Sequence, residues 1–280
     1  ILYIKGKNEE HKKMNISELM KMDKENEKTK QGSPVLSQWL FFGSLAYIIL
    51  FFIKLFASSG VLQGIIDCHS HLLPGVDDGV KKIEDTISIL SLLEEQGVRK
   101  IWFTPHVMED IPNKKADLLN RFAKVKTEYK GNLELSLAAE YMLDNQFNTL
   151  LEADELLPLE EGKHYLLVET SYFNAPIRFH EMLDNIMAKG YFPLLAHPER
   201  YEYMDMNDYK QLKEQGISFQ LNIPSLAGFY GRHVKEKAER ILKADMYDMK
   251  GNDIHSLNAI NFTLKSPISR KSAKKCNEIG

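Results

Sequence analysis

The sequence has 280 residues, of which 44% are hydrophobic and 27% are charged, and its formal net charge is −3. This composition is typical of a globular protein with a sizeable core, and it excludes a mostly disordered chain. With 36 basic and 39 acidic residues, the chain has no net positive charge that would hold nucleic acid. The two cysteines, Cys68 and Cys276, are too few for a disulfide framework or a cysteine-rich zinc site.

The first sixty residues differ in character from the rest. Residues 1–34 are polar and rich in lysine and glutamate, which predicts a disordered extension. Residues 35–57 are mostly apolar, and this run is just long enough for a transmembrane helix of about 20 residues. The alternative is an artefact of the start of the sequence, which opens with Ile1 rather than methionine. We therefore expect a cytoplasmic protein, associated with a membrane if residues 35–57 enter a bilayer.

From Gly64 onward, short apolar runs alternate with amphipathic ones. Seven runs have the apolar or β-branched character of buried parallel strands: Ile65–Cys68, Val98–Phe103, Leu133–Ala138, Tyr165–Glu169, Phe192–Ala196, Ile217–Leu221 and Met246–Met249. Five segments between them have helical spacing: Glu84–Gln96, Lys114–Tyr129, Ile177–Lys189, Asn207–Gln215 and Gly231–Lys243. This alternation predicts a single α/β barrel over residues 62–270, followed by a polar tail at 271–280.

Six of the seven predicted strands are followed by, or end in, a histidine or a carboxylate. In chain order these are His69 and His71, His106, Glu140, Glu169, His197, and finally Asp253 with His255. Because the carboxyl ends of parallel strands meet at one end of a barrel, we expect these side chains to lie together. Singly, each residue is more often structural. Together, imidazoles and carboxylates form a ligand set for Zn, Mn or Fe, often in clusters of two or three ions.

Two further residues lie close to these positions in the sequence. Asp78 belongs to the stretch Leu73–Gly79, whose Pro-Gly and Asp-Asp-Gly pairs are typical of turns, and its carboxylate can fold back onto the cluster. Arg200 follows His197 by three positions, and a guanidinium beside a metal cluster suits a phosphate group. A surface ion pair between Arg200 and Glu202 is the alternative.

The stretch Ile66–Gly79 resembles the opening motif of bacterial PHP (polymerase and histidinol phosphatase) tyrosine phosphatases, manganese-dependent enzymes encoded with capsule and exopolysaccharide genes. The resemblance covers roughly Gly64 to Phe262 and continues through Thr104-Pro105-His106, Ala139-Glu140, Val168-Glu169, Ala196-His197-Pro198-Glu199-Arg200-Tyr201 and Asn252-Asp253-Ile254-His255. Two features depart from the family pattern. Asn252 stands where serine or threonine is usual, and the N-terminal extension is longer than expected.

This resemblance implies a distorted (β/α)7 barrel of the PHP type that holds three metal ions, with Mn favoured and Fe or Zn as alternatives. The implied metal ligands are His69, His71, Asp78, His106, Glu140, Glu169, His197, Asp253 and His255. Arg200 would bind the substrate phosphate, and a metal-activated hydroxide would attack phosphotyrosine in a protein. A metal-bound water, Asp78 or His255 would protonate the leaving tyrosinate. The implied partner is a tyrosine kinase of polysaccharide assembly.

The sequence argues against a cysteine-dependent phosphatase, because Pro74 rather than arginine stands six positions after Cys68. Two other hypotheses stay open. One is a PHP phosphatase for a small molecule such as histidinol phosphate, and the other is a non-catalytic, membrane-tethered regulator of polysaccharide export. Six aromatic residues near the predicted ligands could line a cleft, and the sequence singles out none of them: Tyr141, Tyr172, Phe173, Tyr201, Phe229 and Tyr230.

Overall fold

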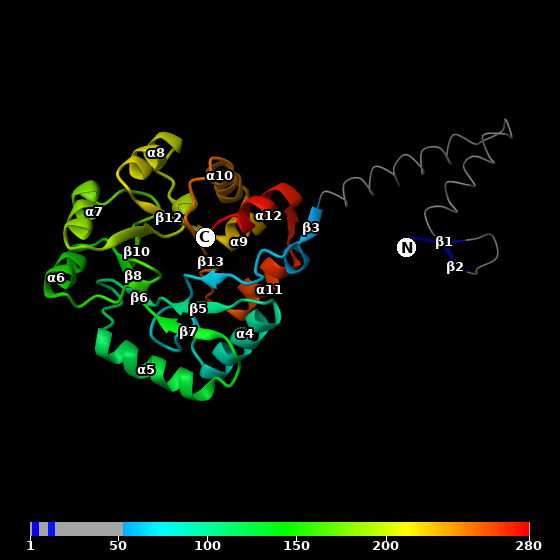
Figure 1. Cartoon of the computed structure of the whole chain (residues 1–280), viewed down its shortest axis with the longest axis horizontal. Helices are drawn as coiled ribbons and strands as arrows, with labels where there is room; N and C mark the ends of the chain where they lie inside the picture. Colours follow the sequence, from blue (N-terminus) through cyan, green and yellow to red (C-terminus); the bar gives the residue numbers. More distant parts are fainter. Residues whose placement is uncertain (1, 6–10, 15–52, 280) are drawn as a thin grey trace. The chain divides into compact units, whose positions relative to one another are not determined.

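The computed structural model describes residues 2–5, 11–14 and 53–279 (Figure 1). The first two segments are strands β1 (Leu2–Lys5) and β2 (His11–Met14), which pair antiparallel. The rest of the extension predicted at 1–34, and the apolar segment predicted at 35–57 as far as residue 52, lie outside the described residues. In the described ranges, no helix is long and apolar enough to cross a bilayer. A separate compact unit begins at Ile53.

This second unit is built on parallel strands. They are β4 (Ile66–Asp67), β5 (Lys100–Phe103), β6 (His106–Val107), β7 (Glu134–Leu137), β8 (Glu140–Met142), β10 (His164–Glu169), β11 (Phe192–Leu195), β12 (Ser218–Asn222) and β13 (Met249–Gly251). One sheet has the order β4-β5-β7, and another runs β6-β8-β10-β11-β12-β13. The Cys68 amide donates to the Lys250 carbonyl over 3.0 Å, which brings β13 beside the end of β4. The predicted α/β barrel is confirmed.

Two of the seven predicted strands are each followed by a second short strand. Between β5 and β6 lies Pro105, which lacks the N–H that a continuous ladder would need. A two-residue gap, Ala138 and Ala139, likewise separates β7 from β8. As a result, His106 and Glu140 are not loop residues but the paired first residues of β6 and β8.

The last predicted strand is displaced by three residues. The sequence predicts Met246–Met249, whereas β13 begins at Met249 and includes Lys250 and Gly251. These two residues resemble a loop in the sequence, but the fold needs the glycine. A Cβ at Gly251 would lie 2.5 Å from the Cβ of His69, so a side chain there would keep β13 away from β4.

Helices cover the outside of the barrel (Figure 1). All five predicted helices are present, each end within two residues of the prediction: α4 (Ile83–Glu95), α5 (Lys115–Glu128), α7 (Phe179–Ala188), α8 (Met206–Glu214) and α10 (Arg232–Lys243). Helix α5 illustrates the cause, because Leu118, Phe122 and Val125 recur at helical spacing and are buried against the barrel. The sequence missed α6 (Asn145–Ala153), α9 (Ile223–Ala227) and α11 (Leu257–Lys265).

The barrel unit extends past both predicted boundaries, 62 and 270. Strand β3 (Ile53–Leu55) pairs antiparallel with β14 (Pro267–Ser269), ahead of the short helix α3 (Phe56–Ser59). The predicted polar tail is mostly helix α12 (Arg270–Asn277). Its lysines make the sequence look like a solvated tail, but Ala273, Cys276 and Ile279 recur every three residues and are buried.

Alternate residues of the strands form two separate apolar clusters. Leu166 and Val168 of β10 pack in the large cluster between strands and helices, whereas Leu167 packs with Trp102 and Leu194 in a smaller one. Because successive strand residues point to opposite faces, this smaller cluster fills the barrel interior. It lies beneath the carboxyl ends of the strands, where the predicted ligands are.

Candidate metal centre

All nine predicted ligands lie together at the carboxyl ends of the strands. They form four overlapping groups, and within each group the ligand atoms lie within 4.8 Å of one another: His71, Asp78, His106 and His255; His69, His71 and Asp253; His69, Glu140 and His197; and His106, Glu140 and Glu169. They come from six separate places in the chain, because His69, His71 and Asp78 all follow β4, and Asp253 and His255 both follow β13. The closure of the barrel is what brings these six places together.

The carboxylate of Glu140 is at the middle of the cluster. Its Oε2 lies 3.2 Å from Nε2 of His69, 3.2 Å from Nε2 of His71 and 3.1 Å from Nδ1 of His106. The other carboxylate near the two Nε2 atoms is Asp253, whose Oδ1 is 3.4 Å from His69 and 3.2 Å from His71. An oxygen placed among three imidazole nitrogens has the geometry of a ligand shared between ions.

Four buried polar atoms of the cluster form no hydrogen bond of suitable geometry with a described residue, although His106 Nδ1 lies 3.1 Å from Glu140 Oε2 and 3.0 Å from Glu169 Oε1. They are Oε2 of Glu140, Oε1 of Glu169, and Nδ1 of His106 and of His197. Leaving a buried polar atom unpaired costs roughly 1–3 kcal/mol, so such atoms are uncommon away from functional sites. Imidazole nitrogens and carboxylate oxygens suit divalent Mn, Fe and Zn, and the residues present therefore fit divalent metal ions.

Local backbone geometry also marks the site. His197 and Asp253 have φ angles of 34° and 47°, in the left-handed region that residues other than glycine rarely adopt. At Gly79, an added Cβ would lie 2.2 Å from the carbonyl oxygen of His71. Only glycine therefore lets the Asp77-Asp78-Gly79 turn fold back beneath His71.

Two residues that the sequence analysis did not select hold the imidazoles from behind. Asp77 Oδ2 lies 2.8 Å from Nδ1 of His71 and also accepts the His106 amide over 3.1 Å. Gln220 Oε1 lies 3.0 Å from Nδ1 of His69. These contacts turn the Nε2 atoms of both histidines toward the cluster, as in the outer contacts of known metal sites. Asp77 is adjacent to a predicted ligand, whereas Gln220 looks like an ordinary strand residue.

The unusual Asn252 has a defined role in the fold. Its side-chain amide donates to Asp67 Oδ2 over 2.8 Å, and its backbone amide donates to Asp67 Oδ1 over 2.9 Å. These bonds tie the turn before Asp253 to the end of β4. Burial raises the pKa of Asp67 to about 6, although the bonds from Asn252 oppose this.

Arg200 lies beside the cluster with its guanidinium between two tyrosine rings. The guanidinium carbon is 4.3 Å from the ring centre of Tyr172 and 4.2 Å from that of Tyr230. Its Nη1 donates to Asp253 Oδ2 over 2.9 Å, so Arg200 pairs with a predicted ligand and not with Glu202, the alternative that the sequence left open. Within the described residues this is its one ion pair, and other N–H groups of the fork stay available.

The other four aromatic candidates fall into two kinds. Tyr141 and Tyr201 are buried, and their hydroxyls bond to backbone groups: Tyr141 accepts the Leu157 amide, and Tyr201 donates to the Ala196 carbonyl. Phe173 and Phe229 are exposed. The first pair therefore belongs to the core, and the second lies next to the tyrosines that hold Arg200.

Opposite charges within the cluster shift the pKa values of its members. Burial lowers the pKa of His71, but hydrogen bonds with Asp253, Asp77 and Glu140 outweigh it and raise that pKa well above its usual value. Burial raises the pKa of Glu140, but the neighbouring imidazoles outweigh it and hold that pKa well below its usual value. The Glu140 carboxylate is thus held in its ionised form and the His71 imidazole in its protonated form, so metal binding at His71 would release a proton.

Asp78 and His255 form the solvent-facing edge of the cluster. The Asp78 side chain is 67% exposed, and its Oδ1 lies 3.4 Å from Nε2 of His255 and 3.6 Å from Nε2 of His106. The hydrogen bond with His255 lowers the pKa of Asp78 below its usual value. The entrance to the site is therefore on the side of these two residues.

The chain was compared with known proteins. The sequence model of the family described as capsular polysaccharide synthesis, CpsB/CapC, matches residues 65–278. The tyrosine-protein phosphatase YwqE of Bacillus subtilis is 30% identical over 204 residues, 71% of this chain and 80% of YwqE. The tyrosine-protein phosphatase CpsB of Streptococcus pneumoniae is 29% identical over 206 residues, 70% of this chain and 84% of CpsB.

A solved structure agrees with these matches. A crystal structure from a study of YwqE and CpsB, described there as unique metal-dependent tyrosine phosphatases, has a TM-score of 0.62 and 26% identity, covering 76% of this chain and 86% of that one. The family match includes every one of the nine clustered residues and Arg200. The chain therefore belongs to the CpsB/CapC family of capsular polysaccharide synthesis.

Proposed function

We propose that this protein is a metal-dependent protein-tyrosine phosphatase. The observation that carries the proposal is a cluster of five imidazoles and four carboxylates, buried except at its Asp78 and His255 edge, with an arginine fixed beside it. This combination suits the hydrolysis of a phosphate ester, since ions and arginine both attract phosphate oxygens. Family relatives that bear the name tyrosine-protein phosphatase support the choice of phosphotyrosine.

We propose further that the nine side chains hold three divalent ions. Catalytic metal sites commonly use three protein ligands for each ion, and nine side chains supply this number for three ions. Mn²⁺ is the ion we favour, with Fe²⁺ or Zn²⁺ as alternatives. When bound, the ions would supply a nucleophile at neutral pH and withdraw charge from the phosphate.

The protein's own side chains would divide the remaining work. Arg200 would bind the phosphate through the N–H groups that Asp253 leaves available, while the two tyrosine rings fix its plane. Asp78 would act as an ionised ligand, because its lowered pKa makes it a poor proton donor. His255, whose Nδ1 faces the Asp253 carbonyl oxygen, would likewise act as a ligand through Nε2. A water at the open edge beside Asp78 and His255 would then donate the proton to the tyrosyl oxygen, whose pKa is near 10 after release.

The partner we propose is a phosphorylated tyrosine kinase of polysaccharide assembly. The family's description, capsular polysaccharide synthesis, supports this choice. A cytoplasmic location fits the two free, buried cysteines, Cys68 and Cys276, because cytoplasmic proteins keep their thiols reduced. Residues 35–52, ahead of β3, would bring the enzyme close to a membrane-bound kinase.

The test is phosphate release from a phosphotyrosyl peptide by the full chain, after chelation and again after adding Mn²⁺, Fe²⁺ or Zn²⁺. We expect activity to disappear on chelation and to return with Mn²⁺. Activity that survives chelation but is lost on thiol alkylation would overturn the metal mechanism. Faster turnover of histidinol phosphate than of the peptide would instead favour a small-molecule phosphatase.

A further inference from the structure

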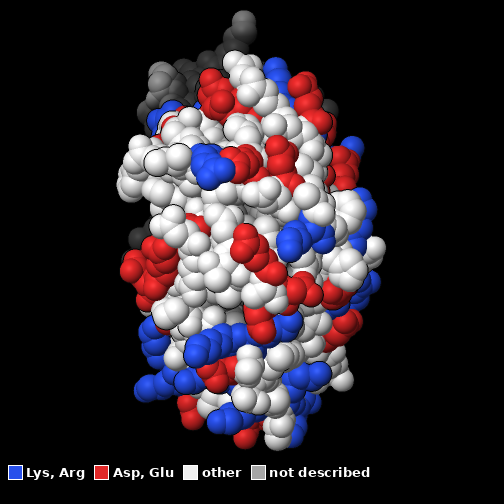
Figure 2. Space-filling view, turned by 90° about the vertical axis from the view of Figure 1, so that its left-hand side faces the viewer, with Lys and Arg blue, Asp and Glu red and all other residues white. Residues whose placement is uncertain are grey.

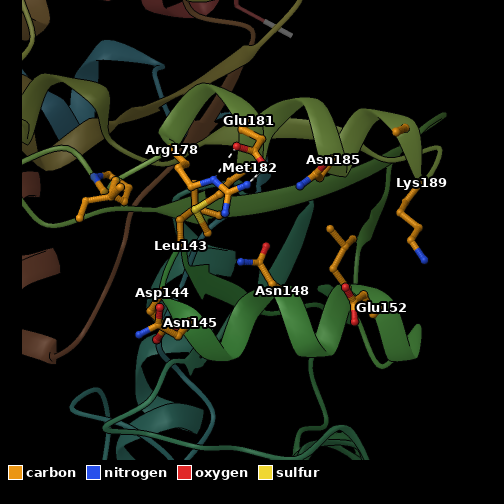
Figure 3. Close-up of a pocket in the computed structure, with 14 residues that line it drawn as sticks. Leu143, Asp144, Asn145, Asn148, Glu152, Arg178, Glu181, Met182, Asn185 and Lys189 are labelled. Carbon is orange, nitrogen blue, oxygen red and sulfur yellow. Dashed lines mark hydrogen bonds and ion pairs between the residues drawn. The ribbon is translucent and has the colours of Figure 1, made fainter.

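A groove of about 800 Å³ lies between helices α6 and α7, outside the metal centre (Figure 3). One end is formed by Leu143, which follows β8, and by Pro176 and Ile177, in the loop after β10. Those two strands carry Glu140 and Glu169 of the cluster. The groove therefore opens at the same end of the barrel as the metal centre and leads away from it.

The loop of residues 170–178 connects the two sites. Tyr172, near its start, packs on Arg200 at 4.3 Å and on the His197 ring at 5.8 Å between centroids. Ile177, near its end, lines the groove. Between these points the loop presents apolar surface to solvent, since Phe173 is 65% exposed and Ile177 is 89% exposed. The loop that leads from the phosphate-binding position to the groove thus carries two exposed apolar side chains, with the exposed Asn174 between them.

The groove walls carry three asparagines from facing helices: Asn145 and Asn148 from α6, and Asn185 from α7. In Figure 3, Asn148 points up from α6 and Asn185 points down from α7 into the space between them. No hydrogen bond of these three side-chain amides occurs with any described residue. A side-chain amide both donates and accepts, so it matches the N–H and C=O groups of a peptide backbone.

The groove is lined by charged side chains of both signs, so neither sign dominates: Asp144, Glu152, Arg178, Glu181 and Lys189. Arg178 and Glu181 on the groove wall pair with each other, with Nε and Oε2 at 2.6 Å. Figure 2 views the side of the barrel that carries α6 and α7, and it shows acidic and basic side chains interspersed with wide uncharged areas. The groove is therefore suited to an uncharged segment with free backbone groups, rather than to a highly charged ligand.

We propose that this groove binds the polypeptide flanking the phosphotyrosine, in an extended conformation. The inference rests on the proposed function and makes its substrate a protein segment, because a small phosphate ester would end near Arg200 and leave the groove empty. Helix α6 has nine residues and is about 13 Å long, which matches about four residues of extended chain.

The experiment compares two substrates of the full chain in Mn²⁺: free phosphotyrosine, and a peptide with about five residues on each side of phosphotyrosine. The test variants are the double change Asn148→Ala with Asn185→Ala, and separately Ile177→Ser. Matched controls on the outer face of α5 are Asn120→Ala and Leu119→Ser, since both residues are exposed and neither lines the groove.

For the groove variants we expect KM for the peptide to rise about fivefold to tenfold, because each variant loses one or two hydrogen bonds or an apolar contact with the peptide. Turnover of free phosphotyrosine by the groove variants should stay within about twofold of that of the unmodified protein. The control variants should turn over both substrates within the same limit. An equal change for both substrates, or no change for the peptide, would overturn the proposal.

A failure of the proposed function can be told apart from a failure of the groove. If neither substrate is hydrolysed with any divalent metal, the phosphatase proposal fails. The groove is then judged by fluorescence anisotropy of a labelled phosphotyrosyl peptide. Weaker binding to the groove variants than to the α5 controls supports the groove, and equal binding contradicts it.

Discussion

The two ends of this barrel treat buried polar groups in opposite ways. At the amino end, Lys100 pairs with Glu134 at 2.9 Å and with Glu161 at 2.6 Å, and Trp102 Nε1 donates to Glu161 over 2.8 Å. At the carboxyl end, the ligand cluster contains four buried atoms that no described residue satisfies. The paired polar groups at the amino end contribute to the stability of the fold. The buried polar atoms at the carboxyl end are instead positioned to bind another group, such as a metal ion.

The apolar cluster inside the barrel separates these ends. Trp102, Leu167 and Leu194 fill the space between them and keep water from entering the metal centre from below. Changes at the carboxyl end should therefore affect activity and metal content, and changes below it should affect stability.

Replacing His197 with alanine should reduce phosphatase activity by about a thousandfold or more. The change removes a predicted metal ligand whose Nε2 lies beside the carboxylates of Glu140 and Glu169. We expect the circular dichroism spectrum to be unchanged and the metal content, measured by mass spectrometry, to fall. Full activity with normal metal content would remove His197 from the centre.

Replacing Trp102 with alanine should lower the free energy of unfolding by about 3–5 kcal/mol, the usual cost of emptying a buried aromatic site. Metal content should be retained below the melting temperature, because no predicted ligand is altered. Denaturant unfolding and metal analysis check the two parts. Loss of metal from a folded variant would show that the two ends are not independent.

A pH effect should arise from Glu199, whose carboxyl accepts the Asn222 amide at 3.1 Å and the Tyr247 hydroxyl at 3.0 Å. Burial raises the pKa of Glu199 to about 7 in the folded state. Its stabilising contribution is therefore complete below the unfolded pKa and is lost as pH rises toward 7.

We expect up to about 3 kcal/mol of unfolding free energy to be lost between pH 5 and 8 through this group. The measurement is denaturant unfolding in chelator at both pH values, compared with Glu199→Gln, which removes this part of the pH dependence. Identical pH dependence in the two proteins would mean that Glu199 does not titrate as described.

Replacing Arg200 with alanine should lower kcat/KM for the phosphotyrosyl peptide by about a hundredfold, the usual cost of losing one charged donor to the phosphate. Arg200→Lys should not restore it, because an ammonium group cannot form two parallel hydrogen bonds. Metal content should be unchanged in both variants. A lysine variant with normal kinetics would leave Arg200 only as a partner of Asp253.

The relation between sequence and structure differs from one part of the site to another. His69, His71 and His197 could be selected from the sequence because each directly follows a strong apolar run, and parallel strands end on one side. Asp77 and Gln220 could not, because their role depends on which imidazole nitrogen they face. The same limit applies to Arg200, whose partner is Asp253, distant in sequence, and not the nearby Glu202.

The sequence by itself determined five of the helices, most of the longer strands and the positions of the predicted ligands, since hydrophobic periodicity and strand ends are local properties of a chain. Tertiary structure alone decided what depends on distant pairings. The pairing of β6 with β8, the pairing of β3 with β14 and the burial of Cys276 follow from how the barrel closes. The groove between α6 and α7 has the same origin, because its walls come from two helices that only the closed sheet brings face to face.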